Sequence, residues 1–183
     1  MIALIILGVI VLFCITMYNT LTRKRNNVDN AFGSIDAMLK KRYDLIPNLV
    51  ATVQQYAKHE EGTFTKITGL RTKSYDSLTG EEKAEFDRTF NAAQRSFFMV
   101  AENYPQLRAS ENFMQLQRTL NETEEQLSAS RRTYNACVTD YNNAVMTFPS
   151  NLVANVFGFT KKEVLTIPEA ERANPNVKNL FQS

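Results

Sequence analysis

Large apolar residues recur at alternating steps of three and four between positions 28 and 57. They stand at Val28, Phe32, Ile35, Leu39, Ile46, Leu49, Val53 and Tyr56, with one gap, at Arg42. This spacing is typical of the apolar face of a helix that packs along other helices. The pattern predicts a long helix over 28–59 that connects an apolar N-terminal segment to a helical bundle.

Further segments downstream carry the same helical spacing. Thr79 and Glu82 form a capping-box pattern, which predicts the start of a helix that ends before Pro105. Its expected inward positions are Phe86, Phe90, Ala93, Phe97, Val100 and Tyr104. Ser110 is predicted to cap a longer helix, over 110–148. Its expected inward positions are Phe113, Leu116, Leu120, Thr123, Leu127, Ser130, Tyr134, Cys137, Tyr141, Val145 and Phe148.

Shorter segments complete the helical pattern. Ser150 is predicted to cap a helix over 151–157, with Gly158 at its C-terminal cap. Positions 62–78 also show helical spacing, and the pattern leaves open whether they form a separate helix or a continuation of the first.

No strand-like alternation occurs, and the connections between the periodic segments are short. The predicted fold class is therefore all-α, with an N-terminal transmembrane helix followed by an elongated antiparallel bundle similar to a four-helix bundle. The expected boundaries are 1–21 for the membrane helix and 22–159 for the bundle. We expect 160–183 to form an extended or mobile C-terminal tail.

The N-terminus is apolar on every face, unlike a core helix, which would show a polar stripe. Residues 2–17 carry no charge, and an extension to Leu21 gives about 20 residues, or about 30 Å, which is enough to cross a bilayer. No basic residue precedes the run and no small-residue cleavage site follows it, which disfavours a signal peptide. The residues that define the span are Ile2, Leu4, Ile6, Val9, Val11, Phe13, Met17 and the interfacial Tyr18.

Basic residues follow the apolar run and nothing basic but the chain's own start precedes it. Arg23, Lys24 and Arg25 come first, and Lys40, Lys41 and Arg42 come later. By the positive-inside rule, the bundle is expected on the cytoplasmic side, with the N-terminus outside.

Composition excludes several functions. The net charge of +2 over 183 residues gives no basic face for nucleic acid. Cys14 and Cys137 are expected to be two reduced thiols, and His59 is the only histidine. The glutamates at 111, 122, 124 and 125 lack the Glu-x-x-His pattern of a diiron bundle, so a solvated acidic face is expected. We expect no catalytic residues, no cofactor and no metal site, and hence no enzyme.

Two residues interrupt the pattern of the first helix. Arg42 occupies an inward position, where an unpaired buried charge costs several kcal/mol. It is expected either to pair with Asp140, Glu124 or Glu102, or to extend past the bundle edge into solvent. Pro47 removes a backbone hydrogen bond in mid-helix, which predicts either a kink or two separate helices.

Several motifs resemble those of the LemA family. They include 39–50 (LKKRYDLIPNLV), 104–113 (YPQLRASENF), 129–135 (ASRRTYN), Tyr141-Asn142 and Phe148-Pro149. The chain departs from the family at Phe32-Gly33, where tryptophan is usual, and in 162–167, where an aromatic pair is usual. The residues that carry the signature are Arg42, Tyr43, Asp44, Pro47, Asn48, Glu111, Asn112, Arg131, Tyr134 and Asn135.

The resemblance implies a bacterial inner-membrane protein with one N-terminal span and a cytoplasmic helical bundle. It supplies no catalytic residues. We expect a scaffold or adaptor that binds an unidentified membrane or cytoplasmic protein through exposed bundle faces. The alternative is a self-assembling or membrane-remodelling protein, because Phe97, Phe98, Met99 and Val100 place apolar residues on adjacent helix faces and favour homo-oligomers.

Overall fold

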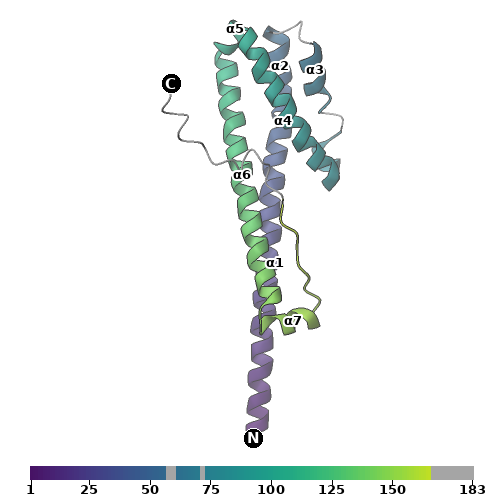
Figure 1. The fold of residues 1–183 in the computed structure, drawn as a ribbon, viewed down its shortest axis with the longest axis vertical. Coiled ribbons are helices and arrows are strands. Elements are labelled where there is room, and N and C mark those ends of the chain that lie inside the picture. The colour runs from purple at the N-terminus through teal and green to yellow at the C-terminus, as the bar shows by residue number, and fades with distance from the viewer. Residues whose placement is uncertain (57–60, 71–72, 166–183) are drawn as a thin grey trace, which may run out of the picture. The chain divides into compact units, whose positions relative to one another are not determined.

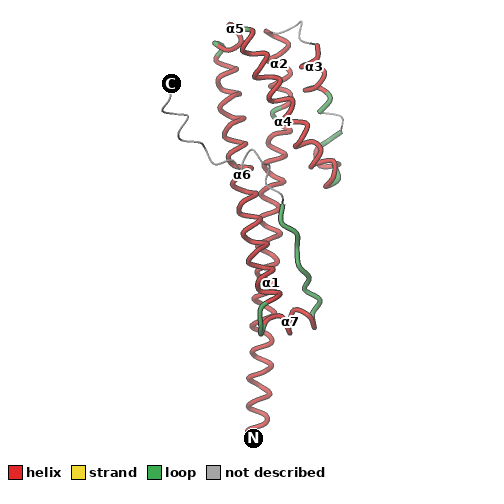
Figure 2. Tube along the Cα trace, viewed as in Figure 1, coloured by secondary structure: helices red, strands yellow, loops and turns green. Residues whose placement is uncertain are grey.

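The computed structural model describes residues 1–56, 61–70 and 73–165 (Figure 1). Helices are the regular elements of these residues, and no strand occurs among them, which confirms the all-α class (Figure 2). The elements are α1 (Ile2–Asp44), α2 (Ile46–Tyr56), α3 (Glu61–Thr68), the 3-10 turn η1 (Tyr75–Ser77), α4 (Gly80–Asn103), α5 (Pro105–Arg108), α6 (Glu111–Met146) and α7 (Ser150–Val156).

The chain divides into two compact units. Unit 1 combines Met1–Phe32 with Ser130–Ser183, and unit 2 is Gly33–Ala129. Each unit therefore contains part of α1 and part of α6. The sequence-based boundaries at 21 and 159 stay predictions, and positions 166–183 of the expected tail lie outside the described residues.

In unit 1, the start of α1 is the candidate membrane span. Among the described residues, only this helix is long and apolar enough to cross a bilayer, and its most apolar window is not buried by protein. The large apolar side chains from Ile2 to Leu12 are exposed. Such a surface is stable when lipid rather than water surrounds it.

The core of unit 1 forms directly beyond this apolar run. Its buried members are Leu21, Val28, Val138, Tyr141, Val153, Ala154 and Phe159. Gly158 ends α7 with a φ of +70°, and the Phe159 N–H donates to the Ala154 carbonyl over 2.9 Å. This left-handed cap confirms the predicted role of Gly158, because residues with a Cβ rarely adopt that conformation.

Unit 2 is built around α4. Its predicted inward positions from Phe86 to Val100 are buried, Ala101 is buried beside them, and the expected Tyr104 is half-buried just beyond the helix. The capping box is also present, since the Glu82 N–H donates to Thr79 Oγ1 over 3.2 Å and the Thr79 N–H donates to Glu82 Oε2 over 2.8 Å. Positions 61–68 form a helix of their own, α3, which settles the question left open by the sequence.

Ser110 also caps α6 as predicted, because its hydroxyl accepts a hydrogen bond from the Phe113 N–H at 3.3 Å. Ser150 does not cap α7. It lies within the first turn and its hydroxyl instead donates to the Ala144 and Thr147 carbonyls, at 2.6 and 2.9 Å. The last carbonyls of a helix have no partner within the helix. The Ser150 hydroxyl therefore bonds to carbonyls at the end of α6 and does not accept from the first N–H groups of α7.

Pro47 produces a local interruption. α1 ends at Asp44, Leu45 forms a turn, and α2 resumes at Ile46, so the predicted single helix is divided by one residue. Helical hydrogen bonding restarts at once, since the Leu49 N–H donates to the Leu45 carbonyl over 3.1 Å. Of the two outcomes expected at Pro47, the structure therefore has two helices, separated by one residue across which hydrogen bonding continues.

The predicted inward rows are wrong at four positions, and at three of them the buried residue is the neighbouring one. Ala31 is buried where Phe32 was expected, and Phe32 is half-exposed against the Tyr134 ring. On α6, Arg131 and Val138 are buried where Ser130 and Cys137 were expected, and Phe148 lies outside the helix. An α-helix drifts by about 20° per heptad against a strict seven-residue repeat, so the buried row moves by one position along a long helix.

Candidate functional site

Arg42 is buried in unit 2, with only 1% of its surface exposed. Its Nη1 donates to Asp87 Oδ1 over 2.6 Å and to Asn91 Oδ1 over 3.2 Å. Its Nη2 forms an ion pair with Glu124 Oε2, and the guanidinium lies 5.4 Å from the centre of the Phe90 ring. Arg42 is thus buried and paired, so it ties α1 to both α4 and α6.

The predicted partners of Arg42 were right only for Glu124. Asp140 belongs to unit 1, where its carboxylate pairs with Lys24 Nζ at 2.5 Å. Glu102 lies 15 residues beyond Asp87 on α4, about 22 Å along the helix axis, which is too far for Arg42 to contact both. Asp87 was missed, although Asp87 and Asn91 stand one turn apart beside the inward Phe86 and Phe90.

Tyr43, the neighbour of Arg42, is also buried and has a structural role. Its hydroxyl donates to the Lys73 carbonyl, and its ring lies 5.7 Å from Tyr75 and 5.6 Å from Phe86. Asp44 is exposed. Tyr43 therefore holds the segment around η1 against α1 by a hydrogen bond and a ring contact.

Tyr75 makes a second contact between η1 and α1, through Asp36. The Tyr75 hydroxyl donates to Asp36 Oδ1 over 2.8 Å, and Lys83 Nζ donates to the same oxygen over 2.7 Å. The hydrogen bond from Lys83 holds the pKa of Asp36 below its usual value. Burial, followed by the nearby Asp36 carboxylate, raises the pKa of Tyr75. Both pKa shifts keep Asp36 as a carboxylate and Tyr75 as a neutral phenol at ordinary pH. The hydrogen bond between these two residues therefore has a structural role and does not transfer a proton.

Asn48 and Asn112, two signature residues from distant parts of the sequence, meet at a groove in unit 2. The groove lies between α2 and the start of α6 and has a volume of about 350 Å³. It is lined by Leu45, Asn48, Ala51, Thr52, Gln55, Asn112, Gln115, Leu116 and Thr119. We call it the amide groove, because four of its nine lining residues carry side-chain amides and none is charged.

The amide groove offers both donors and acceptors. A side-chain amide carries two N–H donors and one carbonyl acceptor, the same groups that a peptide backbone presents. Asn48, Gln55, Asn112 and Gln115 are exposed, while Thr52 is buried and donates its hydroxyl to the Asn48 carbonyl over 2.7 Å. Pro47 is not part of this lining and instead lines a second hollow, of about 390 Å³. Glu111 is exposed in the first turn of α6.

The remaining signature residues, Arg131, Tyr134 and Asn135, lie in unit 1, where Arg131 is buried and the other two hold the segment that follows α7. Asn135 Nδ2 donates to the Leu165 carbonyl over 2.8 Å, and the Leu165 N–H donates to Asn135 Oδ1 over 2.8 Å. Asn142 makes the same reciprocal pair with Lys162, at 2.8 and 2.9 Å. The Tyr134 hydroxyl donates to the Glu163 carbonyl over 3.3 Å. Side-chain amides of α6 thus bind an extended backbone.

The residue types that bind metals or carry thiols lie as follows. In the ranges that the structure describes, no group of three or more His, Cys, Asp or Glu residues is placed to hold a metal ion. His59 falls in the range 57–60, outside the described residues. Cys14 and Cys137 are free thiols that pack beside the core of unit 1.

Comparison with known proteins gives a consistent set of relatives. The LemA family profile matches residues 31–179. Protein LemA of Metamycoplasma hominis is 26% identical over 163 residues, which are 88% of this chain and 74% of that protein. Magnetosome protein MamQ 2 of Paramagnetospirillum magneticum and MamQ of Magnetospirillum gryphiswaldense are each 22% identical, over 80% and 81% of this chain. The chain spans 63% and 62% of the length of these two MamQ proteins. None of these names describes an enzyme.

Proposed function

The chain belongs to the LemA family, as its motifs predicted, and we propose that it is a membrane-anchored adaptor whose amide groove binds an extended segment of a partner protein. The lining of the groove carries this proposal. Uncharged amides at Asn48, Gln55, Asn112 and Gln115 match the donors and acceptors of a peptide backbone. A charged ligand would be poorly paired there, because no side chain of the lining bears a charge.

The same chain already contains this type of recognition. On unit 1, Asn135 and Asn142 hold the extended backbone of 162–165 through reciprocal amide hydrogen bonds. Asn112 and Gln115 belong to the same helix, α6, and are exposed with room beside them. The partner is therefore an extended, uncharged polypeptide segment that pairs its backbone with these amides and places small apolar side chains against Leu45 and Leu116.

The membrane placement of the adaptor follows from α1. The MamQ relatives are named as magnetosome proteins, and one helix of the described chain can span a bilayer. We place the bundle on the cytoplasmic side, because Arg23, Lys24 and Arg25 follow the apolar run. The anchor would hold the amide groove at the membrane, where a local partner is concentrated.

Self-assembly is the competing function, and the structure reduces one argument for it. Phe97 and Val100 are buried, and Phe98 packs with its ring 6.3 Å from Phe113. Only Met99 of this apolar stretch is exposed. The stretch therefore leaves little apolar surface for a second copy.

Site-specific photo-crosslinking in native membranes tests the adaptor function. A photoreactive residue replaces Gln115 in the groove, and the matched control replaces Gln117, an exposed glutamine on the same helix that is not part of the lining. We expect position 115 to capture a different protein at one defined segment, and position 117 to give no such product. The crosslink should weaken when Asn48 and Asn112 are both replaced by alanine.

Each other outcome has a definite meaning. Capture of a second copy of this chain from position 115 would support self-assembly instead of the adaptor function. Equal yields at 115 and 117, or a captured segment that is charged or helical, would contradict backbone recognition by the groove. Circular dichroism of each variant checks that the helices are retained.

A further inference from the structure

One end of unit 1 exposes a group of large apolar side chains. They lie on the last turn of α6, the connection after it, and α7: Met146, Phe148, Leu152, Val156 and Phe157. Phe148 and Val156 are 74% and 80% exposed. Single exposed apolar residues are ordinary, but a contiguous group marks a surface that contacts something apolar. We call this group the apolar foot.

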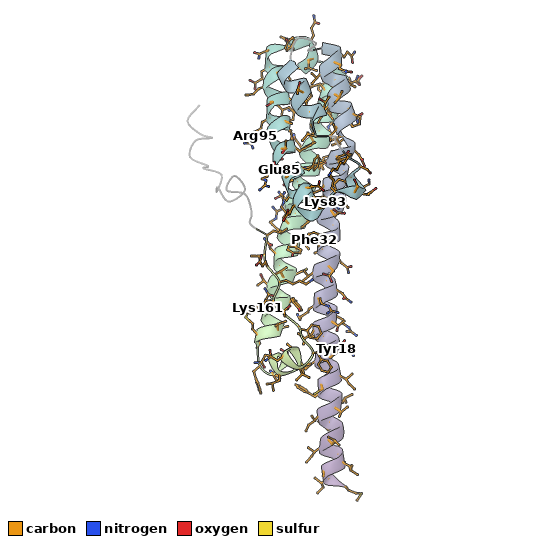
Figure 3. The ribbon with its side chains drawn as sticks, turned by 90° about the vertical axis from the view of Figure 1, so that its right-hand side faces the viewer. Tyr18, Phe32, Lys83, Glu85, Arg95 and Lys161 are labelled. Carbon is orange, nitrogen blue, oxygen red and sulfur yellow. The ribbon has the colours of Figure 1, made fainter. Side chains whose placement is uncertain are left out.

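The apolar foot lies beside the end of the candidate membrane span. The Tyr18 and Phe157 rings are 4.9 Å apart in an edge-to-face arrangement, and Figure 3 shows Tyr18 on α1 at the level of α7. Val153 and Ala154, on the other face of α7, pack into the same core as Leu21. α7 is therefore fixed against α1 rather than free to move away from it.

The length of the span determines where the apolar foot lies relative to the bilayer. A bilayer core of about 30 Å needs about 20 helical residues, which extends the span from Ile2 to about Leu21. Cys14 and Met17 pack against the core that contains α7, and Cys14 precedes Leu21 by about 10 Å along the helix. An amphipathic helix at a membrane surface lies about 5–10 Å into the boundary of headgroups and acyl chains. The end of unit 1 thus occupies that boundary when α1 crosses the bilayer.

Basic residues follow the apolar foot and the span along the chain. Arg23 and Arg25 follow the span on α1, Lys161 follows α7, and all three are exposed. Arg25 lies 5.3 Å from the centre of the Phe159 ring. A membrane surface with anionic lipids favours this order: apolar residues in the bilayer core, aromatic residues at the interface and basic residues beside the headgroups.

We propose that the apolar foot is a second membrane contact, in which α7 and the connection before it insert among the lipids of the interface beside α1. The occupant of this surface is lipid and not another protein, because Phe157 of the foot contacts Tyr18 at the end of the exposed apolar span. The foot would hold unit 1 at the bilayer in one orientation, which a single helix cannot do. This inference rests on α1 crossing the bilayer and is independent of the amide groove.

Tryptophan fluorescence provides the test, because the chain contains no tryptophan. Single variants Phe157→Trp and Leu152→Trp place the probe in the foot of the full-length protein. Ile10→Trp is the reference inside the span. Thr133→Trp is the matched control, since Thr133 is exposed on α6 about 20 Å before Met146. Each variant is reconstituted in phosphatidylcholine–phosphatidylglycerol vesicles, with or without lipids brominated at the upper part of the acyl chain.

We expect Phe157→Trp and Leu152→Trp to emit at shorter wavelength than Thr133→Trp and to lose emission when brominated lipid is present. Thr133→Trp should keep its emission. A blue shift in the foot without quenching by brominated lipid would mean that protein, such as a second copy, covers the foot, and would overturn the proposal. Emission like that of Thr133→Trp would also overturn it. Quenching of Ile10→Trp alone would retain the span and reject the foot.

Discussion

Asn135 and Leu165 form a reciprocal pair of hydrogen bonds, each 2.8 Å long, between a side-chain amide on α6 and the backbone of the segment after α7. Asn142 and Lys162 repeat the arrangement seven residues later on the helix. Two helical turns bring both amides to one face of α6. Backbone N–H and C=O groups beside a core need hydrogen-bond partners. In the segment 162–165, the amide side chains of α6 supply such partners in place of a neighbouring strand.

Replacement of Asn135 by alanine should release this segment. The variant loses two hydrogen bonds to backbone groups, at about 1 kcal/mol each. The Leu165 amide should exchange its hydrogen faster with solvent, while α6 itself remains protected, as measured by hydrogen–deuterium exchange. Asn143→Ala is the control, because Asn143 is exposed on the same helix. Equal protection of Leu165 in both variants would contradict the role of Asn135.

Arg42→Ala should strongly destabilise unit 2. Breaking a buried ion pair by removing one partner costs about 3–5 kcal/mol. The Asp87 side chain is 15% exposed and cannot easily regain water, whereas Glu124 is 38% exposed and partly can, so we expect the lower end of this range. Chemical denaturation of the purified protein in detergent measures the change.

Two further variants test the cause of that loss. Arg42→Leu should cost less than Arg42→Ala because it refills the inward position. Arg88→Ala removes an exposed pair with Glu85 and should cost less than about 1 kcal/mol. An unchanged denaturation midpoint for Arg42→Ala would show that the pairing of Arg42 does not stabilise the fold.

The capping box predicts a specific loss of stability in acid. The bond from Lys73, followed by the bond from the Thr79 amide, lowers the pKa of Glu82 from 4.5 to about 2. The folded state therefore binds fewer protons than the unfolded state between these values, so the stabilisation is full above pH 4.5 and is lost as pH falls towards 2. The difference in melting temperature between the natural protein and Glu82→Gln should be larger at pH 6 than at pH 2.5. A difference that does not change with pH would contradict this assignment.

The membrane orientation can be tested with reporters. Arg23, Lys24 and Arg25 favour a cytoplasmic bundle, so a green fluorescent protein fused after Ser183 should fluoresce and an alkaline phosphatase fused there should be inactive. The same two reporters fused before Met1 are the control and should give the opposite result. An active phosphatase after Ser183 would place the bundle outside.

Much of the fold could be predicted because its signals are local. The apolar run of α1, the capping box at Thr79 and Glu82, the caps at Ser110 and Gly158, and the inward row of α4 each depend on residues within a few turns. Helical periodicity, cap chemistry and glycine's freedom at positive φ act over that range. The motifs also sufficed to predict the family.

The partners across helices required the tertiary structure. The sequence placed Arg42 at an inward position and proposed Glu124, yet only packing could add Asp87 and Asn91 from α4 and exclude Asp140 and Glu102. Likewise, nothing in the sequence joined Asn48 to Asn112 in one groove, or Asn135 to Leu165. Such contacts depend on the rotation of each helix about its axis, and a drift of about 20° per heptad moved Ala31 and Arg131 inward in place of Phe32 and Ser130. The sequence determined which helices form, and their packing decided which side chains meet, because a difference of one residue on a helix turns a side chain by about 100°.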